Sequence, residues 1–310
     1  MNLTNGQITS AIKYLSVESP SPIAKIGSSW NVTAFAATYR VDSEMIAAIT
    51  KIRQDEQAEM QRYVDSVECL MHFLSNSLDD PNAAKCGQCA NCVGRPLVAV
   101  NYDKTLAMKA VHFLRRSFQE LEPRKSWPAH NPLPAYGFSG KITDDLRASE
   151  GRALCLWRDA GWGEQVAHDK YETKRFDDSL VDACASMIEQ WSPEPYPTWV
   201  ACVPSLNNPT IVPDFAERLA AKLGVPFVHC VQKIRSTPPQ KEMRNSFKQA
   251  SNLDGAFQIS HQKMPTGACL LVDDIVDSKW TFTIIAALLR QRGCEAVFPM
   301  ALALSSPRMD

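Results

Sequence analysis

Three cysteines recur at every third position in the sequence CGQCANC at 86–92. They are Cys86, Cys89 and Cys92, and Cys69 precedes them by 17 residues. Three thiolates in one turn repel each other, and a soft divalent cation removes this repulsion once a fourth ligand completes a tetrahedron. The spacing therefore predicts a metal site that is structural, because it leaves no position open for water.

The residues by themselves leave the fourth ligand and the metal open. Cys69 reaches the turn if the chain folds back through 78–85, and His72, one helical turn further along, is the other candidate. Zinc is the expected ion. An iron–sulfur cluster is an alternative, although a ferredoxin pattern has cysteine where this chain has Pro96. A further alternative is that these cysteines are incidental thiols that bind no metal.

A second group of residues could bind a sugar phosphate. The segment LLVDDIVDSKWT at 270–281 is an apolar run that ends in Asp273 and Asp274. Carboxylates at the end of a parallel strand can hydrogen-bond the vicinal hydroxyls of a ribose. The following loop and the first amides of a helix offer unsatisfied N–H groups to a phosphate. The alternative is that the two acids only cap the next helix.

The cysteines require a helix to position them. Between 42 and 74 there is no proline or glycine, and apolar residues recur at steps of three and four. This period is typical of one face of a helix. Asp42 or Ser43 can cap its start. The apolar stripe is interrupted at Glu56 and Glu59, where we expect the helix to bend, break or meet solvent.

Asp273 and Asp274 require a sheet to position them. A second helix is predicted over 106–121, and the Pro-rich stretch 123–140 is the candidate linker. After about Gly151, apolar runs alternate with helices, which predicts a parallel sheet covered on both faces. The runs are 198–204, 225–231, 268–274 and 296–304, and the helices are 177–191, 212–224 and 281–293.

The composition limits the partners. The 310 residues carry 33 Lys+Arg and 34 Asp+Glu, so a uniformly basic nucleic-acid binder is excluded. A local patch could still bind nucleic acid; the candidate is Arg115, Arg116, Arg124 and Lys125 with Trp127, unless these form a solvated helix face. The chain has neither a secretory signal nor a spanning apolar stretch, so we expect a cytoplasmic protein with no membrane partner.

The cysteine segment resembles the zinc module of RecQ-family DNA helicases. The resemblance rests on Arg62-Tyr63, Cys69-Leu70-Met71 and the turn CGQCANC. It implies that Cys69, Cys86, Cys89 and Cys92 bind a structural zinc ion. No GxxxxGK[ST] phosphate loop occurs in the chain. We therefore expect a C-terminal piece of a helicase whose ATP-hydrolysing motor lies elsewhere in the full-length chain.

The segment 270–281 resembles the 5-phosphoribosyl-1-pyrophosphate motif of type I phosphoribosyltransferases. The resemblance implies that Asp273 and Asp274 hold the ribose hydroxyls and that Asp277, as the candidate catalytic acid, lies near the reacting nitrogen. The implied phosphate cradle runs from Asp277 through Ser278, Lys279, Trp280 and Thr281. The family usually has glycine where this chain has Lys279, which could supply charge or block the loop.

The stretch 170–303 looks most like the ComF subgroup of that family. This similarity implies a pyrophosphate loop at Val203-Pro204-Ser205-Leu206, which includes the candidate ligand residues Pro204 and Ser205. It places Lys233 and Arg235 near the phosphates. Mg²⁺ would accompany 5-phosphoribosyl-1-pyrophosphate as a cofactor.

The order of these two parts resembles RqlH-type helicases, which are RecQ-like. The expected fold is multidomain, with an α-helical zinc-binding module followed by an α/β, type I phosphoribosyltransferase-like domain with a mainly parallel sheet. The expected segments are a small N-terminal segment that could be winged-helix-like (1–41), the helical hairpin with the zinc module (42–95), a connecting helix and Pro-rich linker (96–150) and the phosphoribosyltransferase-like domain (151–310).

The expected function is that of an accessory region of an ATP-dependent 3′–5′ DNA helicase in DNA repair. Its α/β domain would bind DNA, a phosphoribosyl ligand or a partner. The alternatives are an active phosphoribosyltransferase and a ComF-like DNA-uptake factor.

Overall fold

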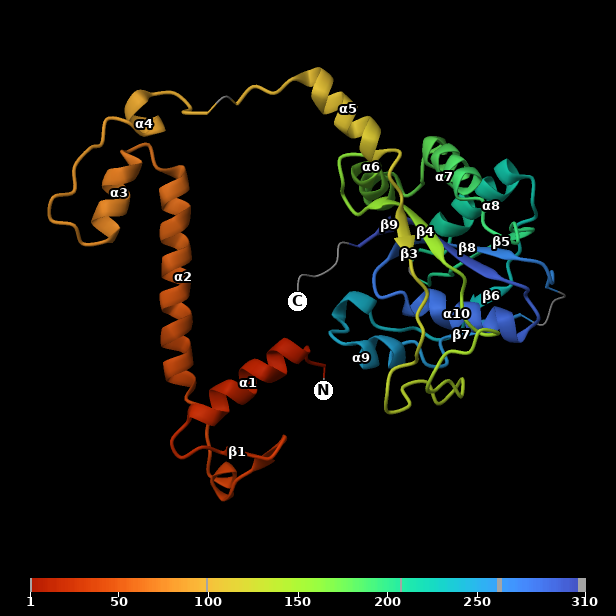
Figure 1. Ribbon diagram of the computed structural model, residues 1–310, viewed down its shortest axis with the longest axis horizontal. Coiled ribbons are helices and arrows are strands. Elements are labelled where there is room, and N and C mark those ends of the chain that lie inside the picture. Colours follow the sequence, from red (N-terminus) through yellow and green to blue (C-terminus); the bar gives the residue numbers. More distant parts are fainter. Residues whose placement is uncertain (1, 99, 207, 261–263, 306–310) are drawn as a thin grey trace. The chain divides into compact units, whose positions relative to one another are not determined.

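A computed structural model describes residues 2–98, 100–206, 208–260 and 264–305. The chain divides into two compact units (Figure 1). The smaller unit is Thr9–Ala107. The larger unit is Met108–Asp310 together with Met1–Ile8. None of the described helices combines the length and the apolar character needed to cross a membrane.

The smaller unit is mainly helical. Its elements in chain order are α1 (Asn5–Val17), a hairpin of β1 (Ile23–Ile26) and β2 (Ser29–Val32), the 3₁₀ turn η1 (Ala34–Ala37), α2 (Ser43–Asp65), α3 (Leu70–Ser77) and α4 (Ala90–Val93). The first residues of α1 belong to the larger unit, and the other boundary falls within α5 (Lys104–Leu114).

The long helix begins as the sequence predicts and ends earlier. Asp42 accepts a hydrogen bond from the amide of Met45 at 2.8 Å, which confirms the cap. Glu56 and Glu59 interrupt the apolar stripe without breaking α2. The break falls at 66–69, where Ser66 turns extended and α3 starts afresh.

The larger unit contains a five-stranded sheet in the order β3-β4-β9-β8-β5. The four strands β4 (Gly151–Leu156), β9 (Val297–Leu304), β8 (Cys269–Val276) and β5 (Trp199–Cys202) are parallel, and β3 (Gln119–Leu121) adds an antiparallel edge. The expected mainly parallel sheet is thus confirmed.

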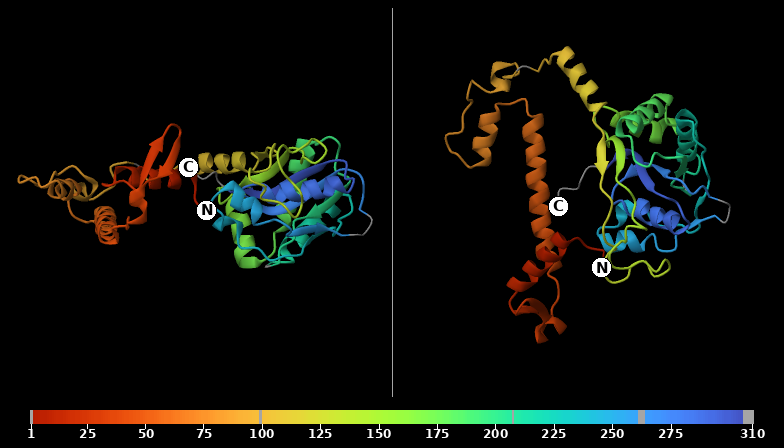
Figure 2. Two further views of the ribbon diagram at one scale, coloured as in Figure 1. Left: turned by 90° about the horizontal axis from the view of Figure 1, so that it is seen from below. Right: turned by 45° about the vertical axis from the view of Figure 1, so that its right-hand side comes forward.

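Helices cover both faces of this sheet (Figure 2). Side chains of a strand alternate between faces. Leu270 and Val272 of β8 therefore pack into the core beneath α7 and α8, whereas Cys269 and Leu271 pack into the core beneath α10. The covering elements are α6 (Gly163–His168), the π-helical segment η2 (Asp169–Thr173), α7 (Asp178–Trp191), α8 (Ile211–Leu223) and α10 (Trp280–Gln291). Burial on both faces explains why the strand sequences are apolar without alternation.

Two predicted elements differ from the structure, one of them only in part. The helix expected over 106–121 ends at Leu114, because residues 119–121 pair with β4 and bury Leu121 at the sheet edge. The run 225–231 forms only a short parallel bridge beside β5. Phe227 pairs with Val200, whose amide donates to the carbonyl oxygen of Pro226 and whose carbonyl oxygen accepts from the amide of Val228, each at 2.9 Å. The chain then forms β6 (Val231–Lys233), η3 (Gln240–Glu242), α9 (Ser246–Ser251) and β7 (Phe257–Ile259), with β6 and β7 paired antiparallel.

The Pro-rich stretch expected to be a linker packs into the larger unit. It belongs to a segment that connects β3 to β4, which we call the strap (residues 122–148). Trp127, Leu133 and Phe138 of the strap are buried in the core on the α10 side of the sheet. The aromatic and proline content of this segment therefore reflects packing.

Candidate functional sites

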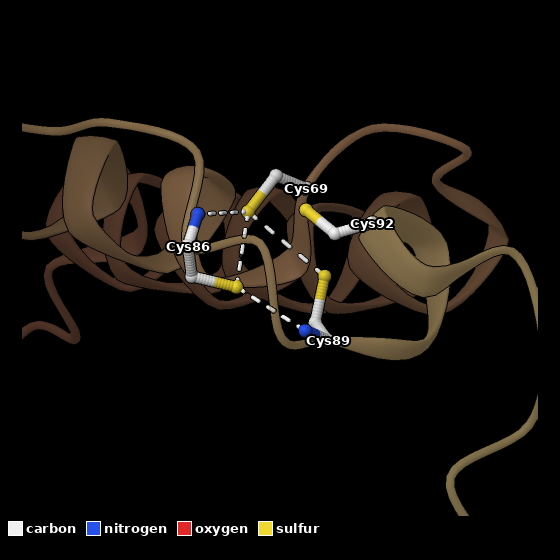
Figure 3. Close-up of side chains that lie close together, drawn as sticks. All are labelled: Cys69, Cys86, Cys89 and Cys92. Atoms are coloured by element: carbon white, nitrogen blue, oxygen red, sulfur yellow. Dashed lines mark hydrogen bonds between the residues drawn. The ribbon is translucent and has the colours of Figure 1, made fainter.

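The four cysteines lie together in the smaller unit (Figure 3). The Sγ atoms of Cys69, Cys86, Cys89 and Cys92 all lie within 4.8 Å of one another. Cys69 Sγ is 3.5 Å from Cys86 Sγ and 3.9 Å from Cys89 Sγ, and all four thiols are free of disulfide bonds. A tetrahedral ion with Zn–S bonds of about 2.3 Å separates its sulfurs by about 3.8 Å. The cluster could therefore hold a metal ion, and its dimensions are consistent with zinc.

Local backbone geometry brings the sulfurs together. Cys69 lies in the break between α2 and α3, and Cys92 lies on α4. Gly87 adopts a left-handed conformation (φ 70°), which reverses the chain after Cys86. The amide of Cys89 then donates to Cys86 Sγ at 3.3 Å. The CGxC sequence thus supplies the turn as well as two of the four clustered sulfurs.

Backbone amides also stabilise the thiolate form of Cys69. Its Sγ accepts from the amides of Cys86 at 3.2 Å and His72 at 3.4 Å. The hydrogen bond from Cys86 is the main cause that lowers the pKa of Cys69 to about 6. Hydrogen bonds with Cys69 and Cys89 raise the pKa of Cys92 to about 12. A metal that binds here must displace the proton that Cys92 keeps.

Of the two candidates for the fourth ligand, Cys69 is the one that lies in the cluster. The ring of His72 pairs with the side-chain amide of Asn76 at 3.3 Å, and Cys69 takes the place in the cluster. Asn91 is a residue that the sequence did not single out. Its side-chain amide donates to the carbonyl oxygens of Ser66 and Glu68, each at 2.6 Å, and so ties α4 to the break that carries Cys69.

In the larger unit, a cavity of about 340 Å³ lies at the carboxyl ends of β5 and β8. This edge is where open α/β sheets bind ligands. Of the ligand and catalytic residues predicted from the sequence, those that line the cavity are Pro204, Ser205, Lys233, Asp273, Asp274, Asp277, Ser278, Lys279 and Thr281. The sheet therefore brings together residues from 204 to 281.

Two predicted ligand residues do not line this cavity. The Trp280 side chain is buried and donates to Ser246 Oγ at 3.2 Å. Arg235 donates to the carbonyl oxygens of Asn252 at 3.0 Å and Asp254 at 2.6 Å. Both side chains brace the loops around the cavity.

The two acids differ in their partners. Asp273 accepts from the amide of Asp274 at 2.8 Å, and Asp274 accepts from the amide of Ile275 at 2.7 Å. Lys170 Nζ lies 2.6 Å from Asp274 Oδ2. Burial, followed by the charge of Asp274, raises the pKa of Asp273 well above its ordinary value. The pair therefore presents an ion-paired carboxylate beside a carboxyl group that holds its proton more tightly.

Lys170 is a cavity residue that the sequence did not reveal. It lies in η2, 104 residues before its partner Asp274. A lysine in the polar run KYETKR carries no local signal for such a contact.

Lys279 adopts the conformation that glycine adopts most easily. Its φ is 65° and its ψ is 0°, in the left-handed region. This conformation costs a non-glycine residue about 1–2 kcal/mol. Burial, aided by the charge of Arg124, lowers the pKa of Lys279, and burial also lowers the pKa of Lys233. Both lysines line the cavity and can offer positive charge to an anion.

The strap contacts the loop that contains Lys279. Arg124 donates to the carbonyl oxygen of Ser278 through Nε at 2.8 Å and Nη2 at 2.6 Å. Trp127 is 6% exposed and stacks on Phe138 and Trp280. The suggestion that Trp127 stacks a nucleic-acid base is wrong, because its ring is enclosed by protein.

Comparisons with known proteins give weak similarities only. No family model and no curated protein matches the chain. A solved adenine phosphoribosyltransferase is 18% identical over 63% of this chain and 89% of its own, with a TM-score of 0.31. The adenine phosphoribosyltransferase from Leishmania donovani is 13% identical over 67% of this chain and 75% of its own, with a TM-score of 0.28. Similarity at this level assigns neither a family nor an activity.

Proposed function

We propose that the larger unit binds 5-phosphoribosyl-1-pyrophosphate, or a closely related phosphorylated ribose, in the cavity at β5 and β8. The observation that carries the proposal is the convergence of Asp273 and Asp274 with Ser278, Thr281 and Lys233 around one cavity. Acids suit the ribose hydroxyls, while hydroxyls, backbone amides and lysines suit the phosphate oxygens. The resemblance of 270–281 to the type I phosphoribosyltransferase motif supports the same ligand.

Mg²⁺ fits this site on chemical grounds. Carboxylate oxygens are ligands that Mg²⁺ prefers, and Asp273 and Asp274 are the residues that would hold it, together with the ligand's own phosphates. When bound, the ion would neutralise charge on the diphosphate. Lys170, whose Nζ lies 2.6 Å from Asp274 Oδ2, would keep that carboxylate oriented.

For the smaller unit we propose a structural zinc ion held by the four cysteines. Together with the resemblance to RecQ-family zinc modules, this supports an accessory role in the cytoplasm as the C-terminal region of a RecQ-like, ATP-dependent helicase in DNA repair. The motor and DNA would be its partners. The larger unit would then bind its ligand to regulate the helicase and would not itself unwind DNA.

Phosphoribosyl transfer is the second candidate. Asp277 favours it, since this exposed acid lines the same cavity as the paired acids. In that reaction Asp277 would lie near the attacking or leaving nitrogen of the base. Lys279, in place of the usual glycine, argues for binding without rapid turnover. A ComF-like uptake factor would share the α/β unit.

The test is a calorimetric titration of the full chain with 5-phosphoribosyl-1-pyrophosphate and Mg²⁺. Binding by the wild type and its loss in Asp273→Asn support the proposal, whereas a wild type without binding overturns it. Salt-dependent binding of forked DNA, measured in parallel, tests the accessory role. Release of pyrophosphate in the presence of nucleobases would favour the transferase.

A further inference from the structure

We propose that Arg124, on the strap, is a positioning residue that sets the backbone of the phosphate loop (residues 277–281) for a phosphorylated ligand. The inference rests on the proposed function, because it concerns the same cavity. Arg124 is absent from the residues that line this cavity and acts on it through Ser278 and Lys279, which do line it.

The contact of Arg124 fixes the orientation of one peptide group. Both of its hydrogen bonds reach a single atom, the carbonyl oxygen of Ser278. In a planar trans peptide the C=O and N–H groups point in opposite directions. The carbonyl turned toward Arg124 therefore turns the amide of Lys279 away from it. Within the described part of the chain this amide donates to no protein acceptor, so it is free for a phosphate oxygen.

Arg124 also restrains the other side of Lys279. Its guanidinium lies 4.0 Å from the ring centre of Trp280, and that ring is buried against Trp127. The left-handed Lys279 is thus held between a fixed carbonyl and a fixed side chain. A non-glycine residue keeps such a conformation only where its surroundings enforce it. A glycine at 279 would need no such restraint.

A positioning role differs from simple attraction between Arg124 and a phosphate. Lysine at this position keeps the positive charge but loses the paired donors and the flat group that stacks on Trp280. Arg124→Lys should therefore weaken ligand binding nearly as much as Arg124→Met. If charge alone mattered, Arg124→Lys would bind like the wild type.

Arg115 provides a matched control in the same unit. It donates through Nε to the carbonyl oxygen of Gly161 at 3.3 Å, and its guanidinium lies 4.4 Å from the ring centre of Trp162. Like Arg124, Arg115 combines a hydrogen bond to a carbonyl oxygen with a stack on tryptophan, although it uses one donor instead of two, and Arg115, Gly161 and Trp162 do not line the cavity. Arg115→Met therefore tests whether loss of an arginine that stacks on tryptophan affects binding by general destabilisation.

The experiment measures the affinity of the full chain for 5-phosphoribosyl-1-pyrophosphate with Mg²⁺ in a double-mutant cycle. Arg124→Met should bind about tenfold more weakly, as expected when a charged hydrogen bond is lost, and Arg115→Met should bind within about twofold of the wild type. In the Lys279→Gly background the effect of Arg124→Met should shrink to about threefold or less, because the two sites are coupled.

Several results would overturn the inference. They are wild-type affinity in Arg124→Met, equal losses in Arg115→Met, wild-type affinity in Arg124→Lys, and independent losses in the cycle. Thermal unfolding without ligand identifies any variant that fails to fold, in which case Arg124→Lys and its double variant replace Arg124→Met. If the wild type binds no ligand, both the proposed function and this inference are refuted. If the wild type binds the ligand and Arg124→Met binds it equally well, only this inference is refuted.

Discussion

Asp273 and Asp274 are neighbours in sequence but differ in how they hold charge. Lys170 neutralises Asp274, whereas the pKa of Asp273 is raised by burial and by the adjacent carboxylate. A raised carboxyl pKa means that the folded chain binds this proton more tightly than the unfolded chain does. The stability that the proton contributes is therefore lost as pH rises from about 3.9, the value for an unfolded aspartate.

Asp273→Asn should weaken ligand binding and increase the stability of the folded chain. Asparagine can still accept from the amide of Asp274 and carries no charge, so the variant should be more stable than the wild type at pH 7.5. The gain should shrink as the pH falls toward and below about 3.9, since wild-type Asp273 is protonated in both states only below that value. Urea unfolding at several pH values measures it. Asp277→Asn, at an exposed acid, is the control, and a gain that does not vary with pH would contradict the argument.

Cys89→Ser should remove the metal and unfold the smaller unit. The serine hydroxyl is a poor replacement for a thiolate ligand, and folding is coupled to structural zinc. Elemental analysis should fall from about one zinc per chain to near zero, with loss of helical circular dichroism. Cys184→Ala, in the core of the larger unit, should keep the metal. A folded, metal-free wild type would refute the zinc assignment.

At the scale of elements, the cavity in the larger unit depends on the close approach of neighbouring strands of the sheet. Gly151 begins β4, and a Cβ atom built there would lie 2.3 Å from the carbonyl oxygen of Pro299 in β9. No side chain fits without moving one strand. Strand β9 pairs in turn with β8, which carries Asp273 and Asp274, so the requirement for glycine at 151 belongs to the framework that positions these acids.

Gly151→Ala should destabilise the larger unit by about 1–3 kcal/mol, the usual cost of overpacking. Chemical denaturation with the fluorescence of the core tryptophans reports the loss. Gly6→Ala is the matched control, since the nearest atom to its Cβ would be Thr4 Oγ1 at 3.8 Å. Equal stability of the two variants would show that the strands can separate at low cost.

For the whole molecule, the two units are stabilised differently. Helices α1, α2 and α3 contain no buried residue, whereas the larger unit has buried clusters on both faces of its sheet. A unit with so little apolar core requires another source of stability, and a metal ion held by the four clustered cysteines would supply it.

A zinc chelator should therefore abolish the thermal transition of the smaller unit and leave that of the larger unit in place. Added 5-phosphoribosyl-1-pyrophosphate with Mg²⁺ should stabilise only the larger unit. Its free energy of unfolding should rise by about 2.7 kcal/mol when the ligand concentration is a hundred times Kd. Calorimetric scans of the full chain separate the two responses. A single transition that responds to both chelator and ligand would mean that the units fold together.

Local sequence was sufficient to predict a site wherever the residues of that site are close together in the chain. Three of the four cysteines fall within seven residues, and Gly87 supplies their turn, so spacing alone predicted a cluster that could hold a metal ion. The acids, the loop and the helix after β8 are likewise contiguous. The alternation of apolar runs and helices predicted the parallel sheet, because strands buried on both faces must be apolar throughout.

Tertiary structure decided the contacts between distant segments. Lys170 meets Asp274 across 104 residues and Arg124 meets Ser278 across 154, and neither pairing leaves a periodic or spacing signal. Proline and aromatic content suggested a linker at the strap, since composition cannot distinguish a loop in solvent from one whose Trp127 is buried. The residue types set the chemistry that is available. Which of them share a cavity depends on how the sheet is ordered, because strand order is fixed by long-range packing rather than by neighbours in sequence.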